Sequence, residues 1–137
     1  MASELKAVTV ITGDAEGELI VSRQPFSFFG GFDFATGQIV DPKSDRHGII
    51  LKDKIFAYPG GKGSSSTAGV ILEALRRGTA PKAIINVECE IILAVGAIVA
   101  EVIFGWNLPL VCLVDADFQR LSTGRYIRIA GERVELF

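Results

Sequence analysis

Two short stretches of alternating or β-branched apolar residues open the chain and predict sheet. They cover residues 7–12 and 18–22, and Gly13, Asp14 and Gly17 lie between them. Glycine and aspartate between two such stretches are typical of a turn. We therefore expect two early strands joined by a turn.

The pattern then changes twice along the chain. Residues 24–48 contain several glycines, two prolines and a charged cluster, which predicts mostly loop with a short strand at 38–40. From residue 55 onward, short apolar runs alternate with longer helical patterns, which indicates an α/β fold with a β-rich, barrel-like body. The expected elements are strands at 55–58, 83–87 and 110–114, a buried helix at 91–104, and a C-terminal hairpin of 126–129 with 134–137.

The segment 59–66, Pro-Gly-Gly-Lys-Gly-Ser-Ser-Ser, stands between a predicted strand and a predicted helix. Hydroxyl residues 64–67 are suitable helix caps, and Arg76, Arg77 and Gly78 are typical of a helix end. Glycines allow the backbone to approach a ligand, and the free amides at a helix start favour negative charge. The segment is therefore the main candidate for a functional site.

The motif alone leaves two interpretations open. A Walker phosphate loop requires Gly-Lys-Ser/Thr, and here Lys62 is followed by Gly63, so the spacing does not match. The serines and glycines could simply cap a helix and form a turn. Alternatively, Lys62 binds a phosphate or an oxyanion inside the loop.

A second glycine-containing loop carries Gly30 and Gly31 among Phe26, Phe28, Phe29 and Phe32. Such a dense aromatic group belongs either to a packed core corner or to a surface that a partner buries. We favour contact with a partner or ligand, and we expect Gly30 and Gly31 to help bind substrate.

Composition limits the classes of function. The 137 residues are 49% hydrophobic and 22% charged, which is enough for one core and predicts a single domain over residues 1–137. The net charge of −2 and the mixed charge pattern give no reason to expect nucleic acid or a membrane surface as partner. The first residues lack a cationic and apolar leader, so we expect a cytoplasmic protein.

The chain offers few metal ligands. Its two cysteines, Cys89 and Cys112, are 23 residues apart, and its only histidine is His47. We expect no metal site on this chain, a surface position for His47, and two separate buried thiols without a disulfide.

Several separated motifs, taken in order, resemble the small subunit of the aconitase X family. They are Ser-Phe-Phe-Gly-Gly-Phe-Asp at 27–33, Thr36-Gly37, the serine segment at 59–66, Gly-Thr-Ala-Pro-Lys-Ala-Ile-Ile at 78–85 and Val-Gly-Ala-Ile-Val-Ala at 95–100. The similarity covers roughly residues 10–115.

This resemblance implies a β/β/α swivelling domain and half of an active site. A large subunit of the aconitase X type would hold a 4Fe-4S cluster that accepts the leaving hydroxyl of a small-molecule substrate. The swivelling domain would supply a serine base at the position of Ser64, with Gly61, Lys62, Gly63, Ser65 and Ser66 around the substrate. On its own the chain would be inactive.

The chain departs from the ordinary aconitase loop at Ser66, where that loop has an arginine. The absence of a guanidinium to clamp a carboxylate argues against citrate-like substrates. The resemblance then implies dehydration of mevalonate 5-phosphate, favoured by Lys62, or of cis-3-hydroxy-L-proline. A non-catalytic phosphate-binding or interaction module remains the alternative of another class.

Overall fold

The order of strands in the main sheet explains most of the architecture. The structure is a computed structural model that describes residues 2–137. Its eight-stranded mixed sheet runs β1-β10-β9-β3-β6-β7-β8-β2, and β4 pairs with β5 in a separate two-stranded sheet. The strands are β1 (Ser3–Lys6), β2 (Val8–Ile11), β3 (Asp14–Val21), β4 (Phe32–Asp33), β5 (Gln38–Ile39), β6 (Ile55–Ala57), β7 (Ala83–Asn86), β8 (Leu110–Cys112), β9 (Tyr126–Ala130) and β10 (Arg133–Leu136).

A bend at Ala7 nearly closes this sheet into a barrel. Ala7 alone separates β1 from β2, and these two strands pair with opposite partners, β10 and β8. The Ala7 side chain is buried, and its N–H donates to the Glu132 carbonyl oxygen (3.0 Å). A small side chain suits such a tight bend, and closure leaves few sheet edges unpaired.

The central strands are parallel and buried on both faces. β3, β6, β7 and β8 run in the same direction, and all residues of β6 and β7 are buried. Because side chains alternate between faces, Phe56 and Ile84 join the core beneath the helices, whereas Ile55 and Ile85 join the core inside the barrel. One set of strands therefore stabilises two cores.

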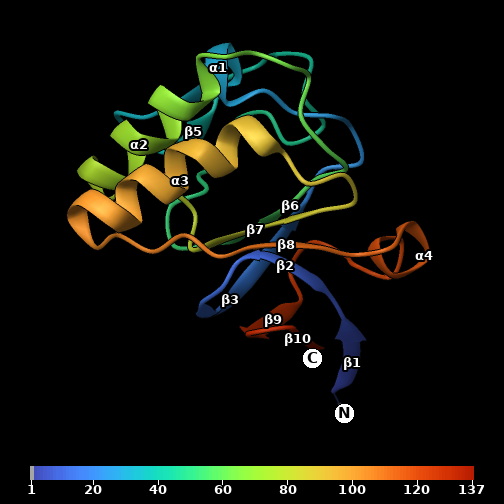
Figure 1. The fold of residues 1–137 in the computed structure, drawn as a ribbon. Coiled ribbons are helices and arrows are strands. Elements are labelled where there is room, and N and C mark those ends of the chain that lie inside the picture. Colours follow the sequence, from blue (N-terminus) through green and yellow to red (C-terminus); the bar gives the residue numbers. More distant parts are fainter. Residues whose placement is uncertain (1) are drawn as a thin grey trace.

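Two helices, α2 (Thr67–Arg77) and α3 (Ile91–Phe104), connect β6 to β7 and β7 to β8 and cover one face of the sheet (Figure 1). α2 ends at Gly78 and α3 at Gly105, both in the left-handed conformation. The helices cross closely at Gly96, where an added Cβ would lie 2.4 Å from the Ala68 carbonyl oxygen. Two short helices complete the fold, α1 (Phe28–Gly31) and α4 (Asp115–Phe118).

The predicted α/β fold with a barrel-like body is confirmed, but two local predictions are wrong and three short elements were missed. Gly17 lies inside β3 because that strand extends back to Asp14 to pair with β9. β1, α1 and α4 were not predicted. α3 is only half buried: Leu93 and Ala97 face the core, whereas Val95 and Val102 are exposed.

Candidate active site

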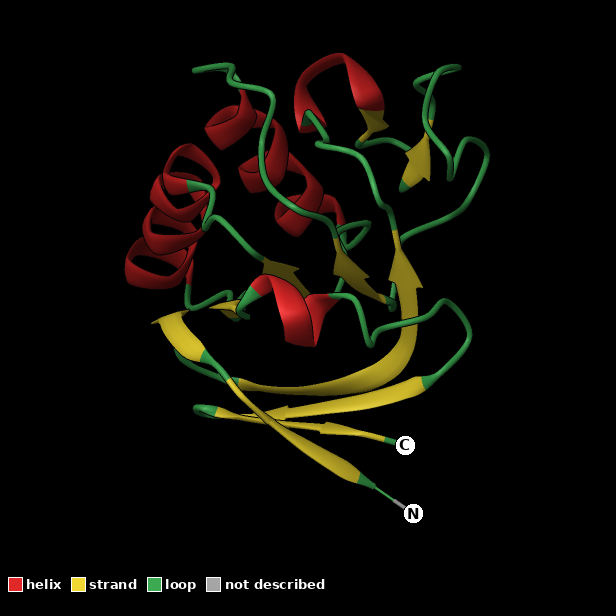
Figure 2. Cartoon of the chain, turned by 90° about the vertical axis from the view of Figure 1, so that its right-hand side faces the viewer, coloured by secondary structure: helices red, strands yellow, loops and turns green. Residues whose placement is uncertain are grey.

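The serine segment lies at the end of the fold where α/β proteins bind ligands. It leaves the carboxyl end of β6, beside the residues that follow β7 and β8. Figure 2 looks onto this end of the molecule, where loops from neighbouring strands gather. Ligands of open α/β sheets bind outside the carboxyl ends of the parallel strands.

Backbone contacts hold the first half of the segment against the aromatic loop. The Phe26 N–H donates to the Gly60 carbonyl oxygen (3.0 Å), and the Lys62 N–H donates to the Phe26 carbonyl oxygen (3.3 Å). Gly63 has a φ of 78°, which favours glycine. The two loops predicted to form the site therefore lie side by side.

Ser64 lies just before α2 and is half-buried. Its Oγ accepts a hydrogen bond from the Ser66 backbone N–H (3.2 Å), and its carbonyl oxygen accepts one from the Thr67 N–H (3.2 Å). A donor to Oγ favours negative charge on that oxygen. Ser65 and Ser66 are exposed.

The predicted capping by four hydroxyl residues is wrong in its details. Ser66 occupies the N-cap position of α2 without a side-chain cap hydrogen bond. Within residues 2–137, the buried Thr67 hydroxyl has no hydrogen-bond partner. Ser64, two residues before the N-cap, makes a local bond instead: its Oγ accepts the Ser66 backbone N–H.

Lys62 has an acidic partner that the sequence did not reveal. Its Nζ lies 3.4 Å from Asp41 Oδ2. The Lys43 backbone N–H, and then the Lys62 ammonium, lower the pKa of the Asp41 carboxyl. The Lys62 side chain remains about half exposed (48%), so it can still reach an anion.

Gly31 lies next to Asp41, the acidic member of this ion pair. A Cβ on Gly31 would be 3.7 Å from the Asp41 Cβ, and α1, which contains both glycines, contacts α2. Gly30 has a φ of 84° and open space around it. The structure therefore brings one of the two predicted glycines, Gly31, close to the acidic partner of Lys62.

The expectation that the phenylalanine loop faces a partner or ligand is wrong for three of its four aromatic residues. Phe26, Phe28 and Phe32 are buried, and the Phe26 ring packs edge-on against Phe28 and Phe56, with ring centroids 5.1 Å apart. Only Phe29 is largely exposed (55%). These rings face the core beneath α2 and not a partner, because burying their large apolar areas stabilises the fold.

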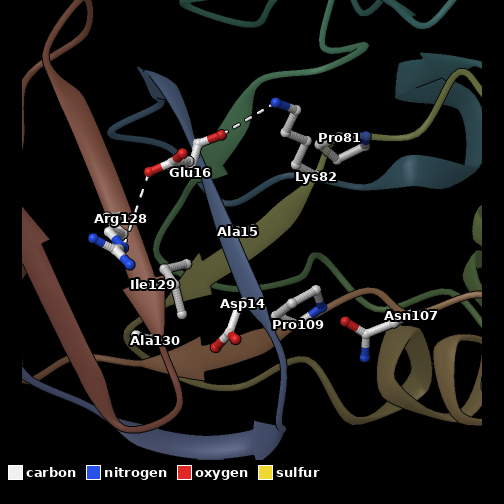
Figure 3. A pocket seen from close by; sticks show the side chains of 10 residues that line it. All are labelled: Asp14, Ala15, Glu16, Pro81, Lys82, Asn107, Pro109, Arg128, Ile129 and Ala130. Atoms are coloured by element: carbon white, nitrogen blue, oxygen red, sulfur yellow. Dashed lines mark hydrogen bonds and ion pairs between the residues drawn. The ribbon is translucent and has the colours of Figure 1, made fainter.

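Two hollows lie at opposite ends of the parallel strands. The smaller, about 260 Å³, adjoins the serine segment and is lined by Pro25, Pro59, Gly60, Gly61, Val87, Glu88 and Asp115. The larger, about 540 Å³, opens near the start of β3 and the end of β9 (Figure 3). It contains none of the predicted site residues, and its charged side chains Lys82 and Arg128 approach Glu16.

A buried polar group lies directly beneath the serine segment. The Tyr58 hydroxyl donates a hydrogen bond to Glu90 Oε2, and the Glu90 N–H donates to Asn86 Oδ1 (3.2 Å). Burial raises the pKa of Glu90, and the Tyr58 hydrogen bond partly opposes that shift. Burial, and then the Glu90 charge, raise the pKa of Tyr58. Sequence reasoning missed Glu90; its position just before an apolar helix was the available signal.

The two cysteines are paired, which contradicts the prediction of separate thiols. Cys89 and Cys112 form a disulfide with Cα atoms 5.8 Å apart. Cys112 lies opposite Asn86 in the β7–β8 register, and the turn after β7 brings Cys89 back beside it. A separation of 23 residues carried no signal for this contact. His47 is exposed, as expected.

Two kinds of feature are absent from the described part of the chain. Among residues 2–137, no three His, Cys, Asp or Glu side chains are grouped so as to hold a metal ion. No helix within that range is both long and apolar enough to cross a membrane.

Known proteins resemble this chain in sequence and in fold. The aconitase X swivel domain matches residues 4–136. The chain is 47% identical to the phosphomevalonate dehydratase small subunit of Pyrococcus furiosus over 97% of this chain and 93% of that one. It is 42% identical to the cis-3-hydroxy-L-proline dehydratase of Hypocrea jecorina, over 96% of this chain but 22% of that longer protein.

Solved structures agree. The crystal structure of Thermococcus kodakaraensis aconitase X in its holo-form superposes with a TM-score of 0.88 at 40% identity, covering 98% of both chains. An NMR structure of a UPF0107 protein gives a TM-score of 0.87 at 36% identity, over 98% of this chain and 99% of the other. The chain therefore belongs to the aconitase X swivel-domain family.

Proposed function

We propose that this chain is the small subunit of an aconitase X dehydratase that acts on mevalonate 5-phosphate and yields an anhydromevalonate phosphate. The observation that carries this proposal is the 47% identity, across nearly the whole chain, to a phosphomevalonate dehydratase small subunit. Small subunits with the same name from Thermococcus gammatolerans and Methanosarcina acetivorans are 43% and 39% identical.

Ser64 is the proposed base. Its alkoxide would take the proton from the substrate carbon, the electron pair of the broken C–H bond would form the double bond, and the hydroxide that leaves the neighbouring carbon would take up a proton from solvent to become water. Three features support this role: Ser64 precedes α2, it is half-buried rather than enclosed, and its Oγ already accepts the Ser66 N–H.

Ser64 needs help to act as a base. The dipole of a helix contributes about 0.3–1 kcal/mol, and one pKa unit corresponds to about 1.4 kcal/mol, so α2 lowers the pKa of a hydroxyl by about one unit at most. That shift is far too small to ionise serine. Further stabilisation would come from the Ser66 amide, the Lys62 ammonium and groups of the large subunit.

We further propose that the partner is a larger subunit of the aconitase X type, that it carries a 4Fe-4S cluster, and that the complex works in the cytoplasm. The described residues of this chain do not provide a ligand set for a cluster. The chain's own residues would bind and orient substrate: Lys62 would attract the phosphate, while Gly30, Gly31, Gly61 and Gly63 would let the backbone approach. Ser65 and Ser66 would lie at the edge of the same substrate-binding site.

Dehydration of cis-3-hydroxy-L-proline is the second candidate. The dehydratases of this name from Hypocrea jecorina and Pseudomonas aeruginosa are 42% and 41% identical to the chain. In this case Lys62 would bind the substrate carboxylate rather than a phosphate.

Reconstitution tests both candidates. The chain is co-expressed with its cognate large subunit, and the purified complex is assayed with each compound under anaerobic conditions. We expect turnover of mevalonate 5-phosphate by the complex and none by the small chain alone. Turnover of cis-3-hydroxy-L-proline alone would replace the first candidate with the second.

Two matched variants test the base. S64A is expected to lower kcat by about 10²- to 10⁴-fold, the range of a positioned proton acceptor. S65A, one residue further along and exposed, is the matched comparison and should lower kcat far less than S64A, because a hydroxyl that only lines the site does not take the proton. A fully active S64A complex would exclude Ser64, and a loss of activity in S65A instead would transfer the role to Ser65.

A further inference from the structure

Beneath the serine segment lies a set of buried polar side chains that the proposed chemistry does not use. Tyr58 and Asn86 are fully buried, and Glu90 is only 9% exposed. A buried carboxyl is costly unless hydrogen bonds or a specific role compensate for its desolvation. Core packing alone would be served better by apolar residues.

Hydrogen bonds connect this set to three elements of the fold. Asn86 Nδ2, at the end of β7, donates to the Tyr58 carbonyl oxygen (3.0 Å) just after β6. Asn86 Oδ1 receives the Glu90 N–H at the start of α3, and the Tyr58 hydroxyl donates to Glu90 Oε2. The Glu90 side chain is therefore held in one place relative to both strands.

The Glu90 carboxyl in turn touches the serine segment. A Cβ built on Gly61 would lie 2.7 Å from both Glu90 Oε1 and its carboxyl carbon. Gly61 does not have a positive φ. The close approach of the carboxyl, rather than backbone strain, therefore explains why this position needs glycine.

We propose that Glu90 is a positioning residue, whose carboxyl supports Gly61 and thereby sets the path of the chain to Ser64, three residues further on. The inference rests on the proposed function of Ser64. The ionised carboxyl, held by the Tyr58 hydroxyl, is the supporting form. Tyr58, just after β6, is the titratable group that faces it, whereas Asn86 from β7 and the Gly61 backbone are neutral.

Complementary substitutions in the reconstituted complex test the contact. G61A should push against the carboxyl and lower kcat about tenfold or more, with a change in KM below about threefold, because a small displacement of a catalytic group costs rate. E90A should also have a lower kcat, since Gly61 loses the support of the Glu90 carboxyl. The double variant G61A/E90A should be faster than G61A, because the truncated side chain leaves room for the new methyl group.

G60A is the matched control. A Cβ on Gly60 would lie 3.3 Å from the Glu88 carbonyl oxygen and makes no contact with Glu90. It should stay within about threefold of wild type. Melting temperatures of all variants separate loss of positioning from loss of fold.

The pH profile gives a second readout. Burial places the pKa of Glu90 above 4.5, so activity should fall on the acidic side as the carboxyl is protonated. E90Q should remove this acidic limb. Y58F should move it to higher pH, because the lost hydrogen bond had lowered the Glu90 pKa. A purely structural Tyr58–Glu90 contact would change the melting temperature without moving the limb.

Hydrogen exchange of the amides at 60–66 in the complex provides a readout independent of turnover. Exchange should accelerate in E90A and not in G60A. The proposal is overturned if this exchange is unchanged in E90A, if G61A is fully active, or if G61A/E90A is no faster than G61A while folded. An inactive wild-type complex would instead refute the proposed function, and the exchange data would still decide the role of Glu90.

Discussion

The crossing of α2 and α3 at Gly96 gives a sharp test of the packing. In the G96A variant, the new Cβ would lie 2.4 Å from the Ala68 carbonyl oxygen and 2.8 Å from Ile71 Cγ2. The first distance is about 1 Å short of an ordinary contact, and a backbone oxygen cannot rotate away as a side chain can. The helices would therefore have to separate.

The magnitude follows from two opposing effects. Overpacking costs about 1–3 kcal/mol, whereas Ala in place of Gly stabilises a helix by about 0.5–1 kcal/mol. An unfolding entropy of about 2.1 cal/mol/K per residue makes 1 kcal/mol worth about 3–4 °C in Tm for a chain of this length. An approach this close to a backbone oxygen belongs at the upper end of the overpacking range, about 3 kcal/mol, which leaves a net cost of about 2–2.5 kcal/mol. We therefore expect G96A to unfold at a temperature about 6–10 °C lower, as measured by scanning calorimetry.

G69A is the matched control on the facing helix. Gly69 is exposed in α2, and nothing lies within 4 Å of its added Cβ. The propensity effect then acts alone and should raise Tm by about 2–4 °C. If G96A melted at or above the wild-type temperature, the close helix crossing would not exist in solution. Because Ala68 belongs to the first turn of α2, G96A should also slow the reconstituted enzyme.

Three further outcomes are expected. Reduction of the Cys89–Cys112 disulfide, which closes a loop of 23 residues, should lower the free energy of unfolding by about 3 kcal/mol in denaturant titrations. Before reduction, an alkylating reagent should label neither cysteine. Two arginines in the last turn of α2 lower the pKa of Glu73 to about 2. The stabilising effect of the ionised Glu73 carboxylate, present above pH 4.5, should therefore be lost as the pH falls toward 2. Carbon NMR of that carboxyl should show this midpoint, and E73Q should flatten the acid dependence of stability. K62A should raise KM for mevalonate 5-phosphate tenfold or more, whereas D41N, which frees the ammonium, should lower it; equal KM values in all three proteins would exclude Lys62 from phosphate binding.

Elements with a strong local signal could be predicted from the sequence. The helix at 91–104 has its predicted ends because an apolar run is stopped by Gly105, and α2 ends at Gly78 for the same reason. The serine segment could be located because glycine and hydroxyl residues punctuate the chain between a strand and a helix. These signals lie within a few residues of the features that they predict.

Features that depend on distant residues could not be predicted. Asp41 reaches Lys62 only because the loop after β5 folds back toward the serine segment, and Cys89 meets Cys112 only because β7 and β8 are neighbours. Phe26, Phe28 and Phe32 looked like a surface because a local pattern does not show which core an aromatic ring will fill. The exposed side of α3 was missed for a related reason, since a helix that is apolar all round does not reveal its outer face.

The antiparallel pairing of β1 with β10 places Ser3 opposite Leu136, so both ends of the domain emerge together on the side away from α2 and α3 (Figure 1). A polypeptide attached at either end would start from almost the same point. Gene fusion in either order could therefore tether this domain to a larger body without obstructing the serine segment. Such freedom is consistent with relatives in which the homologous region is 22% of a longer protein.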